Sequence, residues 1–421
     1  MKILIVQYQG FLNSQGGTEK MATFFANTFS QKGHDVAIVT QDPVEGKSVF
    51  PLDPEVRLIN LYKGKDDCIV LRKIYNYKGK NPLSWIRYKI QKKIDKAHNK
   101  RLMAAQGVRT MDELQIHNLK VRSKNWPSFF AAEKPDIIIS MAISTLLEIT
   151  YQGPLAYPII NTVHGRPDYD YSDILWYRSP QDMDLLKKSY SYLTGIQVLF
   201  ESYEAYLPDT FTGICKVIPN PIPQYEDGQL AKLDQDKDRY QLIHVGSLIN
   251  AGKQQELAME CFAALKDKYP NWDLIFIGEG PDELYLKERS AALGLENRVF
   301  FKGYTAKPEE ELRKADVFIF PSKYEGFGLA LGEAMSIGLP SIGLASCSGV
   351  NELIQHQKTG FLAHDKNEFV NYLDQLMADK DLRIQMGREA HQYVQAFDKT
   401  MVAHKWEEYI HEIHKMHNLQ N

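Results

Sequence analysis

The sequence predicts an α/β protein built from two doubly wound domains that face each other across a cleft. Three observations lead to this prediction. The chain has 421 residues, which is long for one hydrophobic core, so two domains are expected. Short apolar runs rich in β-branched residues recur, and each is followed by a turn and a helical pattern, which is typical of parallel sheets covered on both faces. A proline-rich segment separates an earlier set of these runs from a later one.

The apolar runs give the order of the elements. The first set predicts strands at residues 2–6, 35–40, 136–140 and 158–163. The second set predicts strands at residues 241–245, 273–278, 298–303 and 316–320. Between the sets, the prolines of VIPNPIPQ block a helix, and a polar stretch follows. We therefore expect an N-terminal domain over residues 1–220, a C-terminal domain over 221–400, and a final helix over 401–421.

Composition restricts the class of protein further. The chain is 44% apolar and 24% charged, which is ordinary for a globular protein. Its four cysteines have no paired spacing, so we expect reduced thiols and a cytoplasmic protein. The N-terminal apolar run is too short for a signal-peptide core. No run approaches the roughly 18 apolar residues that a membrane span needs.

One stretch, SKYEGFGLALGEAMSIGLP at residues 322–340, combines two acids with a glycine-rich turn. Its apolar spacing predicts a helix that begins near Phe327 or Leu329 and ends at the following glycine and proline. Glu325 then lies in the loop before this helix, and Glu333 lies about one turn inside it. Both acids can therefore approach one ligand that is bound at the helix N-terminus.

The same turn suits an anion. Gly326 and Gly328 let backbone N–H groups come close to a ligand, and the helix N-terminus favours negative charge there. Two carboxylates beside a phosphate would repel it, so they make sense if they accept hydrogen bonds from hydroxyl groups. A sugar and a ribose joined by a diphosphate fit that pattern. The alternative is that both glutamates are ordinary solvated residues.

The form EGFGLALGE, after an apolar strand and the dipeptide PS, closely resembles the signature of glycosyltransferase family 4. Further motifs extend the resemblance over nearly the whole chain: QGGTEKMA, NTVHG, IPNPI, VGSLINAGK, IGEGPDE and an aromatic-rich last helix. The resemblance implies the GT-B fold, with two facing Rossmann-like domains and a last helix that crosses back to the first. It also implies a retaining, metal-independent enzyme without a cofactor. Such an enzyme moves a sugar from a nucleotide diphosphate to a lipid-linked or growing cell-surface glycan.

The resemblance assigns roles to the loop and helix described above. Glu333 is expected to bind the donor's ribose hydroxyls, and Glu325 the hydroxyls of the transferred sugar near the reacting centre. The backbone N–H groups of Phe327, Gly328 and Leu329 are expected to hold the sugar and the diphosphate.

A lysine completes the implied donor site. Lys253 matches the family lysine that neutralises the diphosphate as it leaves, where removal of such a contact costs on the order of 10²-fold in rate. The commoner family pattern has arginine at the position of Ser247. Either Lys253 therefore works alone, or another cation such as Lys323 or Arg166 helps it.

Residues of the first domain are also implied. Gly16 and Gly17 match a glycine loop that faces the diphosphate and acceptor; the alternative is a tight turn with Thr18 as helix N-cap. His164, in NTVHG, matches a histidine near the donor sugar, where its ring binds a hydroxyl or its carbonyl stabilises positive charge. In the second domain, the resemblance implies that Tyr304 lies where the family binds the nucleobase.

No metal site is expected. The segment Asp168-Tyr169-Asp170 reads like the D-x-D of metal-dependent glycosyltransferases, but it lies in a polar loop of a different fold. Four histidines near the end are expected to decorate a helix: His404, His411, His414 and His417. The apolar face of that helix is expected to be Trp406, Tyr409, Ile410 and Ile413. IGEGPDEL lacks the third glycine of a dinucleotide fingerprint, which argues against a dehydrogenase.

The segment 61–125 is strongly basic, with 17 Lys/Arg and 5 Asp/Glu. It contains an apolar stripe at Ile86, Ile90, Ile94 and Ala97, flanked by Trp85, Tyr88 and several lysines. This pattern predicts an amphipathic helix on an anionic membrane, and hence a peripheral location on the inner face of the cell membrane. A solvated insertion is the alternative. Nucleic acid would be attracted too, but no recognition motif accompanies the charge.

Two other functions remain open at this point. One is a related GT-B enzyme, a sugar phosphorylase or a nucleotide-sugar epimerase. The other is a non-catalytic sugar-nucleotide-binding partner of another glycosyltransferase, for which the serine at position 247 is the best support. The sequence does not identify the sugar, the acceptor or the nucleobase of the donor. Uridine is expected only from its frequency in the family.

Overall fold

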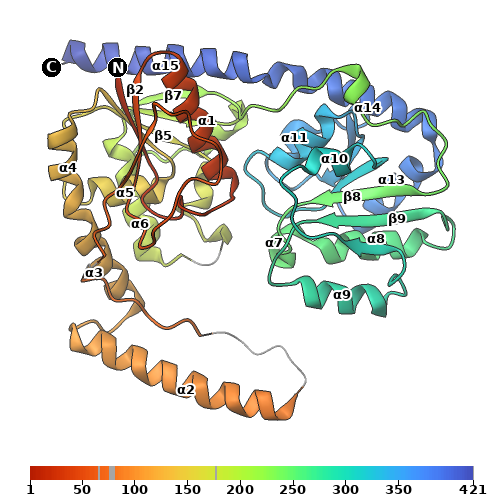
Figure 1. The fold of residues 1–421 in the computed structure, drawn as a ribbon, viewed down its shortest axis with the longest axis horizontal. Coiled ribbons are helices and arrows are strands. Elements are labelled where there is room, and N and C mark those ends of the chain that lie inside the picture. Colours follow the sequence, from red (N-terminus) through yellow and green to blue (C-terminus); the bar gives the residue numbers. More distant parts are fainter. Residues whose placement is uncertain (65–66, 75–80, 176–177, 421) are drawn as a thin grey trace.

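The structure is a computed structural model that describes residues 1–64, 67–74, 81–175 and 178–420. Two α/β domains lie side by side, and a long C-terminal helix runs from the second domain along the first (Figure 1). Each domain has one parallel sheet with helices on both faces. The two facing doubly wound domains predicted from the sequence are confirmed.

The N-terminal domain contains a seven-stranded sheet in the order β3-β2-β1-β4-β5-β6-β7, and its described pairings are all parallel. The central strands β1 and β4 are apolar and buried apart from one end residue each, the half-buried Lys2 and the buried but polar Ser140, as expected for strands covered on both faces. The strands are β1 (Lys2–Val6), β2 (Asp35–Thr40), β3 (Arg57–Asn60), β4 (Ile137–Ser140), β5 (Ile159–Thr162), β6 (Gly195–Val198) and β7 (Ile214–Val217).

Two sets of helices cover this sheet. One face packs on α1 (Gly17–Gln31) and on the C-terminal helix α15 (Lys399–Gln420). The other face packs on α3 (Met111–Ser123), α4 (Asn125–Glu133), α5 (Ile143–Thr150) and α6 (Pro180–Ser189). One local prediction is wrong. Helix α1 begins at Gly17 with Gly16 as its N-cap, so Thr18 lies in the first turn and no side chain caps the helix.

The C-terminal domain contains a six-stranded parallel sheet in the order β10-β9-β8-β11-β12-β13. Its strands are β8 (Tyr240–Val245), β9 (Trp272–Ile277), β10 (Val299–Phe301), β11 (Val317–Phe320), β12 (Ser341–Leu344) and β13 (Gly360–Ala363). Its helices are α7 (Asn250–Lys253), α8 (Gln255–Leu265), α9 (Glu283–Ala292), α10 (Pro308–Leu312), α11 (Leu329–Ser336), α12 (Val350–Leu353), α13 (Lys366–Ala378) and α14 (Lys380–Val394).

In both sheets the strand order reverses beside the first strand, between β1 and β4 and between β8 and β11. Ligands of doubly wound sheets bind outside the carboxyl ends of the strands at such switch points. The loops that leave β1, β8 and β11 carry the glycine pair, Ser247 and Glu325. The topology therefore places these predicted residues at the two binding edges.

Helix α15 completes the core of the N-terminal domain. The Trp406 ring lies 4.6 Å from the Phe25 ring of α1, measured between centroids. The Tyr409 hydroxyl lies within hydrogen-bond distance of two strand carbonyl oxygens, those of Ile196 (3.1 Å) and Ile214 (2.8 Å). The predicted apolar face is buried throughout: Trp406, Tyr409, Ile410 and Ile413.

Helix α2 (Pro82–Ala105) lies apart from both sheets (Figure 1). A small apolar cluster around Ile69, Val108 and Leu114 holds it, and the Asn99 side chain pairs with the backbone of Arg72. Its apolar stripe faces solvent, with Ile86, Ile90 and Ile94 exposed by 48, 57 and 51%. Residues 65–66 and 75–80 of the predicted basic segment lie outside the described residues. None of the described helices is long and apolar enough to span a bilayer.

The packing of α15 gives a stability prediction. Trp406→Ala removes a fully buried indole from the core that α15 shares with α1, so the free energy of unfolding of the N-terminal domain should fall by about 3–5 kcal/mol. Urea denaturation followed by circular dichroism measures the loss. Lys405→Ala, at the neighbouring exposed position, is the control and should change stability by less than about 0.5 kcal/mol. Equal effects of the two substitutions would contradict the assigned packing.

Candidate functional site

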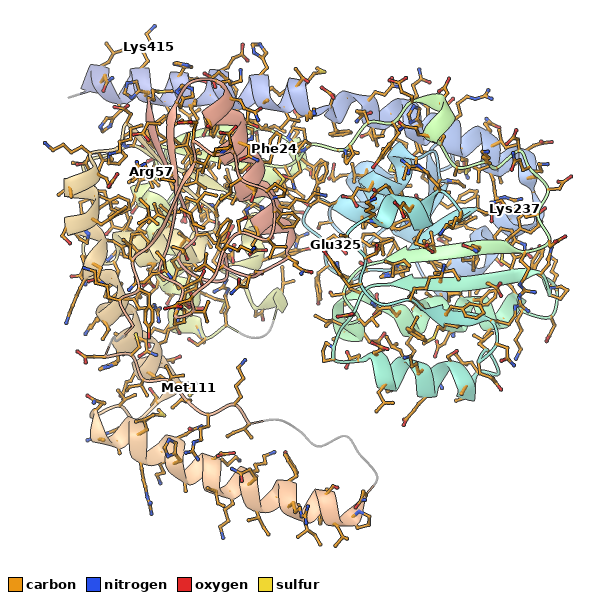
Figure 2. All side chains as sticks on the ribbon, in the orientation of Figure 1. Phe24, Arg57, Met111, Lys237, Glu325 and Lys415 are labelled. Atoms are coloured by element: carbon orange, nitrogen blue, oxygen red, sulfur yellow. The ribbon has the colours of Figure 1, made fainter. Side chains whose placement is uncertain are left out.

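Glu325 lies where the two domains face each other (Figure 2). Its loop follows β11, and α11 begins at Leu329, one of the two starts predicted from the apolar spacing. The N-cap residue Gly328 has a φ of 82°, in the left-handed region that a side chain disfavours. This conformation turns the chain sharply into the helix, so the first N–H groups of α11 point toward the space between the domains.

Gly326 makes backbone contact with the other domain. A Cβ atom added at this glycine would lie 1.6 Å from the carbonyl oxygen of His164, which follows β5. On the opposite side, the Tyr203 hydroxyl donates a hydrogen bond of 2.7 Å to the carbonyl oxygen of Gly326. No residue other than glycine fits this position. The contact holds the His164 segment directly against the loop that carries Glu325.

Lys253 and Glu325 form an ion pair, in which the Lys253 ammonium donates to Oε1 of the carboxylate. Lys253 is the last residue of the short helix α7, in the connection between β8 and α8. The lysine side chain is 24% exposed and the glutamate 11%, so solvent screens the pair only partly. Two residues that were expected to bind different parts of one donor thus neutralise each other.

Glu333 forms a second ion pair, which joins the domains. The Lys20 ammonium, from α1, donates to Oε1 of Glu333 in α11 at 2.6 Å. Sequence reasoning missed Lys20 as a site residue, although it belongs to the QGGTEKMA motif. Its position one turn after Gly17 places it on the face of α1 that meets the second domain.

Two adjoining cavities contain all the predicted site residues. The first has a volume of about 560 Å³, and its lining includes Lys20, Ser247, Tyr304 and Glu333. The second has a volume of about 400 Å³, and its lining includes Gly16, Gly17, His164, Ser247, Lys253, Glu325, Gly326, Phe327, Gly328 and Leu329. Both cavities touch Gln15 and the segment 245–247, so they lie next to each other.

A third cavity of about 380 Å³ continues the row on the side of the N-terminal domain, and shares His164, Glu325 and Gly326 with the second. Its lining includes Arg166 and Arg178. Both acids of the D-x-D-like segment are paired with these arginines: Asp168 with Arg166 at 2.7 Å and Asp170 with Arg178 at 2.7 Å. Arg166 thus lies at the far end of the row, while Lys323 is exposed and lines none of the three cavities.

His164 lies between the second and third cavities. Burial lowers the pKa of its imidazole to about 4 from an ordinary value of 6.5, so the ring is neutral at physiological pH. Its Nε2 lies 3.1 Å from the Thr162 hydroxyl. A neutral ring can exchange hydrogen bonds with a hydroxyl group but cannot act as a fixed cation. The positive charges of the site therefore come from the lysines and arginines.

The chain is similar in sequence to known glycosyltransferases. Residues 227–393 match the family of glycosyl transferases group 1. The chain is 29% identical to an uncharacterised glycosyltransferase of Haemophilus influenzae over 45% of its own length and 53% of the relative. It is 30% identical, over 45% of its length and 51% of the relative, to a Campylobacter jejuni enzyme named N-acetylgalactosamine-N,N'-diacetylbacillosaminyl-diphospho-undecaprenol 4-alpha-N-acetylgalactosaminyltransferase. The matched part of the chain thus spans about half the length of these relatives.

Similarity of fold extends over the whole chain. The structure superposes on that of S. aureus TarM with a TM-score of 0.69 and 15% identity, covering 97% of this chain and 100% of TarM. The TarM structure is described as a complex with UDP, alpha-GlcNAc-glycerol and Fondaparinux. The chain therefore has the GT-B fold, and residues 227–393 of its C-terminal domain match the glycosyl transferases group 1.

Proposed function

We propose that this protein is a retaining, metal-independent glycosyltransferase that moves a sugar from a nucleotide diphosphate donor, with UDP the expected nucleotide, to a lipid-linked or growing cell-surface glycan. The observation that carries the proposal is the row of three adjoining cavities, with Glu333, Glu325 and His164 spaced along it. The TarM complex with UDP supports a uridine nucleotide. The diphospho-undecaprenol named for the Campylobacter relative supports a lipid-linked acceptor.

The three cavities accommodate the parts of such a donor in order. The base lies against Tyr304 and the ribose at Glu333 in the first cavity. The diphosphate lies at the N-terminus of α11, where free N–H groups favour an anion. The sugar lies in the second cavity between Glu325 and His164, and the acceptor enters through the third.

Transfer requires charge to develop on the diphosphate as the bond between sugar and phosphate breaks. The Lys253 ammonium moves from Glu325 to the departing diphosphate and neutralises its charge. The hydroxyls of the sugar then donate hydrogen bonds to the Glu325 carboxylate in place of the lysine. The reaction occurs on the front face, with the leaving phosphate as base for the acceptor hydroxyl. Holding donor and acceptor together between the domains supplies much of the rate.

The uncharged Ser247 leaves the diphosphate short of one cation compared with the commoner family pattern. Lys20 lines the same first cavity as Ser247 and pairs with Glu333 in the absence of a ligand. When ribose hydroxyls bind to Glu333, this lysine becomes free to face the diphosphate. We propose that Lys20 supplies part of the missing charge. The serine also favours a second candidate function, sugar-nucleotide binding without turnover.

We also propose that α2 attaches the protein to an anionic membrane. Its exposed isoleucines are accompanied by Leu83 and Trp85, exposed by 72 and 45%. The Lys89 ammonium lies 3.8 Å from the centroid of the Trp85 ring, so a cation and an apolar ring share one surface. Each cation near an anionic bilayer contributes on the order of 1 kcal/mol. A solvated insertion would not require a stripe of isoleucines in water.

Glu325→Gln should leave the fold intact and lower the rate of transfer by on the order of 10²-fold or more. The neutral amide accepts hydrogen bonds from sugar hydroxyls more weakly than the carboxylate does, and it no longer forms an ion pair with Lys253. Release of nucleotide diphosphate in the presence of acceptor measures the rate. Glu288→Gln, an exposed position of α9, is the matched control and should retain full activity. Wild-type turnover in the Glu325 variant would refute its role.

Nucleotide binding should stabilise the protein without a metal ion. UDP at about 100 times its dissociation constant should add about 2.7 kcal/mol and raise the Tm, equally with and without EDTA. GDP and ADP are the comparison ligands, and Glu333→Gln should reduce the shift by weakening the ribose contact. A shift that EDTA abolishes would contradict metal independence. Binding without turnover over a wide acceptor panel would favour the non-catalytic alternative, and release of sugar phosphate a phosphorylase.

Vesicle sedimentation tests the membrane proposal. The protein should sediment with anionic vesicles but not with neutral ones, and Ile90→Ser should weaken binding on the order of tenfold by removing one apolar contact. Leu284→Ser changes a comparably exposed residue on α9 and serves as the control. Equal binding to neutral and anionic vesicles, or no effect of the Ile90 change, would refute the assignment.

A further inference from the structure

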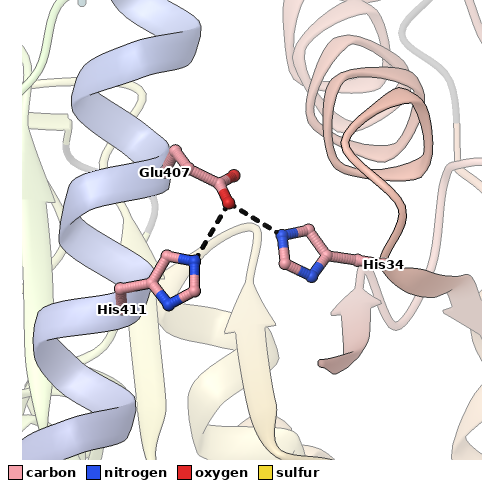
Figure 3. Close-up of side chains that lie close together, drawn as sticks. All are labelled: His34, Glu407 and His411. Carbon is pink, nitrogen blue, oxygen red and sulfur yellow. Dashed lines mark hydrogen bonds and ion pairs between the residues drawn. The ribbon is translucent and has the colours of Figure 1, made fainter.

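Outside the proposed donor and acceptor site, the structure brings together two histidines and a glutamate at the seam between α15 and the N-terminal domain (Figure 3). His34 lies in the turn between α1 and β2. Glu407 and His411 lie one turn apart on α15, so their side chains share one face of that helix. Local sequence patterns could not reveal this cluster, because His34 precedes Glu407 by 373 positions.

The three side chains converge on one point. Oε1 of Glu407 lies 3.0 Å from Nε2 of His34 and 3.1 Å from Nε2 of His411. These ligand atoms all lie within 4.8 Å of one another. A tetrahedral zinc ion binds nitrogen and oxygen at about 2.0–2.1 Å, which sets its ligand atoms roughly 3.3 Å apart. The observed spacing therefore needs only small side-chain movements to enclose such an ion.

The glutamate gives a second, independent indication. Its other carboxylate oxygen, Oε2, is buried and has no hydrogen-bond partner among the described residues. A buried carboxylate oxygen without a donor is uncommon and calls for an explanation. A cation at this point would satisfy both oxygens of the carboxylate.

The surroundings hold the first histidine in place. The imidazole of His34 is almost fully buried, and its Nδ1 lies 3.0 Å from the amino nitrogen of Met1. This contact orients the ring so that Nε2 faces Glu407. A metal ion at Nε2 displaces the proton there, so Nδ1 then carries the hydrogen and the Met1 amino group accepts it in its uncharged form. His411 is more exposed, with 58% of its side chain accessible, so an ion can enter from solvent on that side.

We propose that His34, Glu407 and His411 form a binding site for one late first-row divalent metal ion, with Zn²⁺ as the fitting ion and water as a fourth ligand. Two imidazoles and one carboxylate are a donor set that such ions prefer over Mg²⁺ or Ca²⁺. The ion joins the α1–β2 turn to α15 and so fastens the C-terminal helix to the N-terminal domain.

This site is separate from the transfer reaction. His34 follows the end of α1 that is distant from the cleft, and α1 alone spans about 22 Å from Gly17 to Gln31. The ion therefore has a structural role, and the proposed metal independence of transfer is unaffected. The inference departs from the expectation that the histidines of the last helix only decorate its surface.

Isothermal titration calorimetry of the full chain with ZnCl₂ at pH 8 tests the proposal. The protein retains Met1 at its N-terminus, and bound metal is first removed with EDTA, which is then removed in turn. One zinc ion per chain should bind and raise the Tm. His411→Ala, a largely exposed position whose loss leaves the core intact, should weaken zinc binding at least tenfold and remove the Tm increase. Glu407→Gln should do the same.

His404→Ala is the matched control. His404 also pairs with a glutamate one turn away on α15, Glu408 at 3.4 Å, but no third ligand accompanies that pair among the residues that the structure describes. This variant should bind zinc like the wild type. Absence of zinc binding by the wild type, unchanged binding by the His411 variant, or an equal loss in the His404 variant would each overturn the proposal. UDP binding is measured on the same variants and should not change, so failure here is distinct from failure of the donor site.

Discussion

The approach of Gly326 to the carbonyl oxygen of His164 is the constraint on which the site depends. At this point the backbone of one domain touches the backbone of the other, and even a methyl group would separate them. The stacked rings of Phe200 and Phe327, 5.2 Å apart at 14°, lie next to it and bury the same seam. Because Glu325 and His164, the proposed sugar-binding residues, belong to different domains, the distance between them is set by this contact rather than within either sheet.

The paired charges of the site explain how two acids can lie beside an expected anion. Each glutamate forms an ion pair with a lysine, Glu325 with Lys253 and Glu333 with Lys20, so the four side chains together have no net charge. A ligand that offers hydroxyls to the acids and phosphates to the lysines exchanges partners without leaving a charge unpaired. Unpaired charge in a partly buried site is costly, so this exchange favours a ligand that carries both kinds of group. A bare polyol or a bare phosphate satisfies only half of the site.

Much of the fold and site could be predicted from local sequence, and the parts that could not share a cause. Continuous β-branched runs reveal buried central strands such as Ile137–Ser140, but β3 reads RLIN and β7 ICKV, partly exposed segments without such a run. The loop and helix around Glu325 follow from glycines and apolar spacing alone. Lys20 and His34 do not, because each acquires its role from a partner more than 300 positions away. Thr18 failed as an N-cap because the extended Gly16 begins the helix two residues earlier.

Helix α15 determines how the domains can move. Its aromatic face belongs to the N-terminal core, so it stays with that domain when the cleft opens. The chain crosses between the domains twice, near Ile222 and near Phe397, and the Ile222 N–H donates to the Phe397 carbonyl oxygen at 2.9 Å. Two crossings joined by a hydrogen bond form a narrow hinge, since the φ and ψ changes of a domain rotation can be absorbed in a few residues there. Rotation about this hinge parts Gly326 from His164 and Lys20 from Glu333 together, while the core under α15 remains closed. Opening for donor entry therefore breaks the interdomain contacts of the site and leaves each sheet intact.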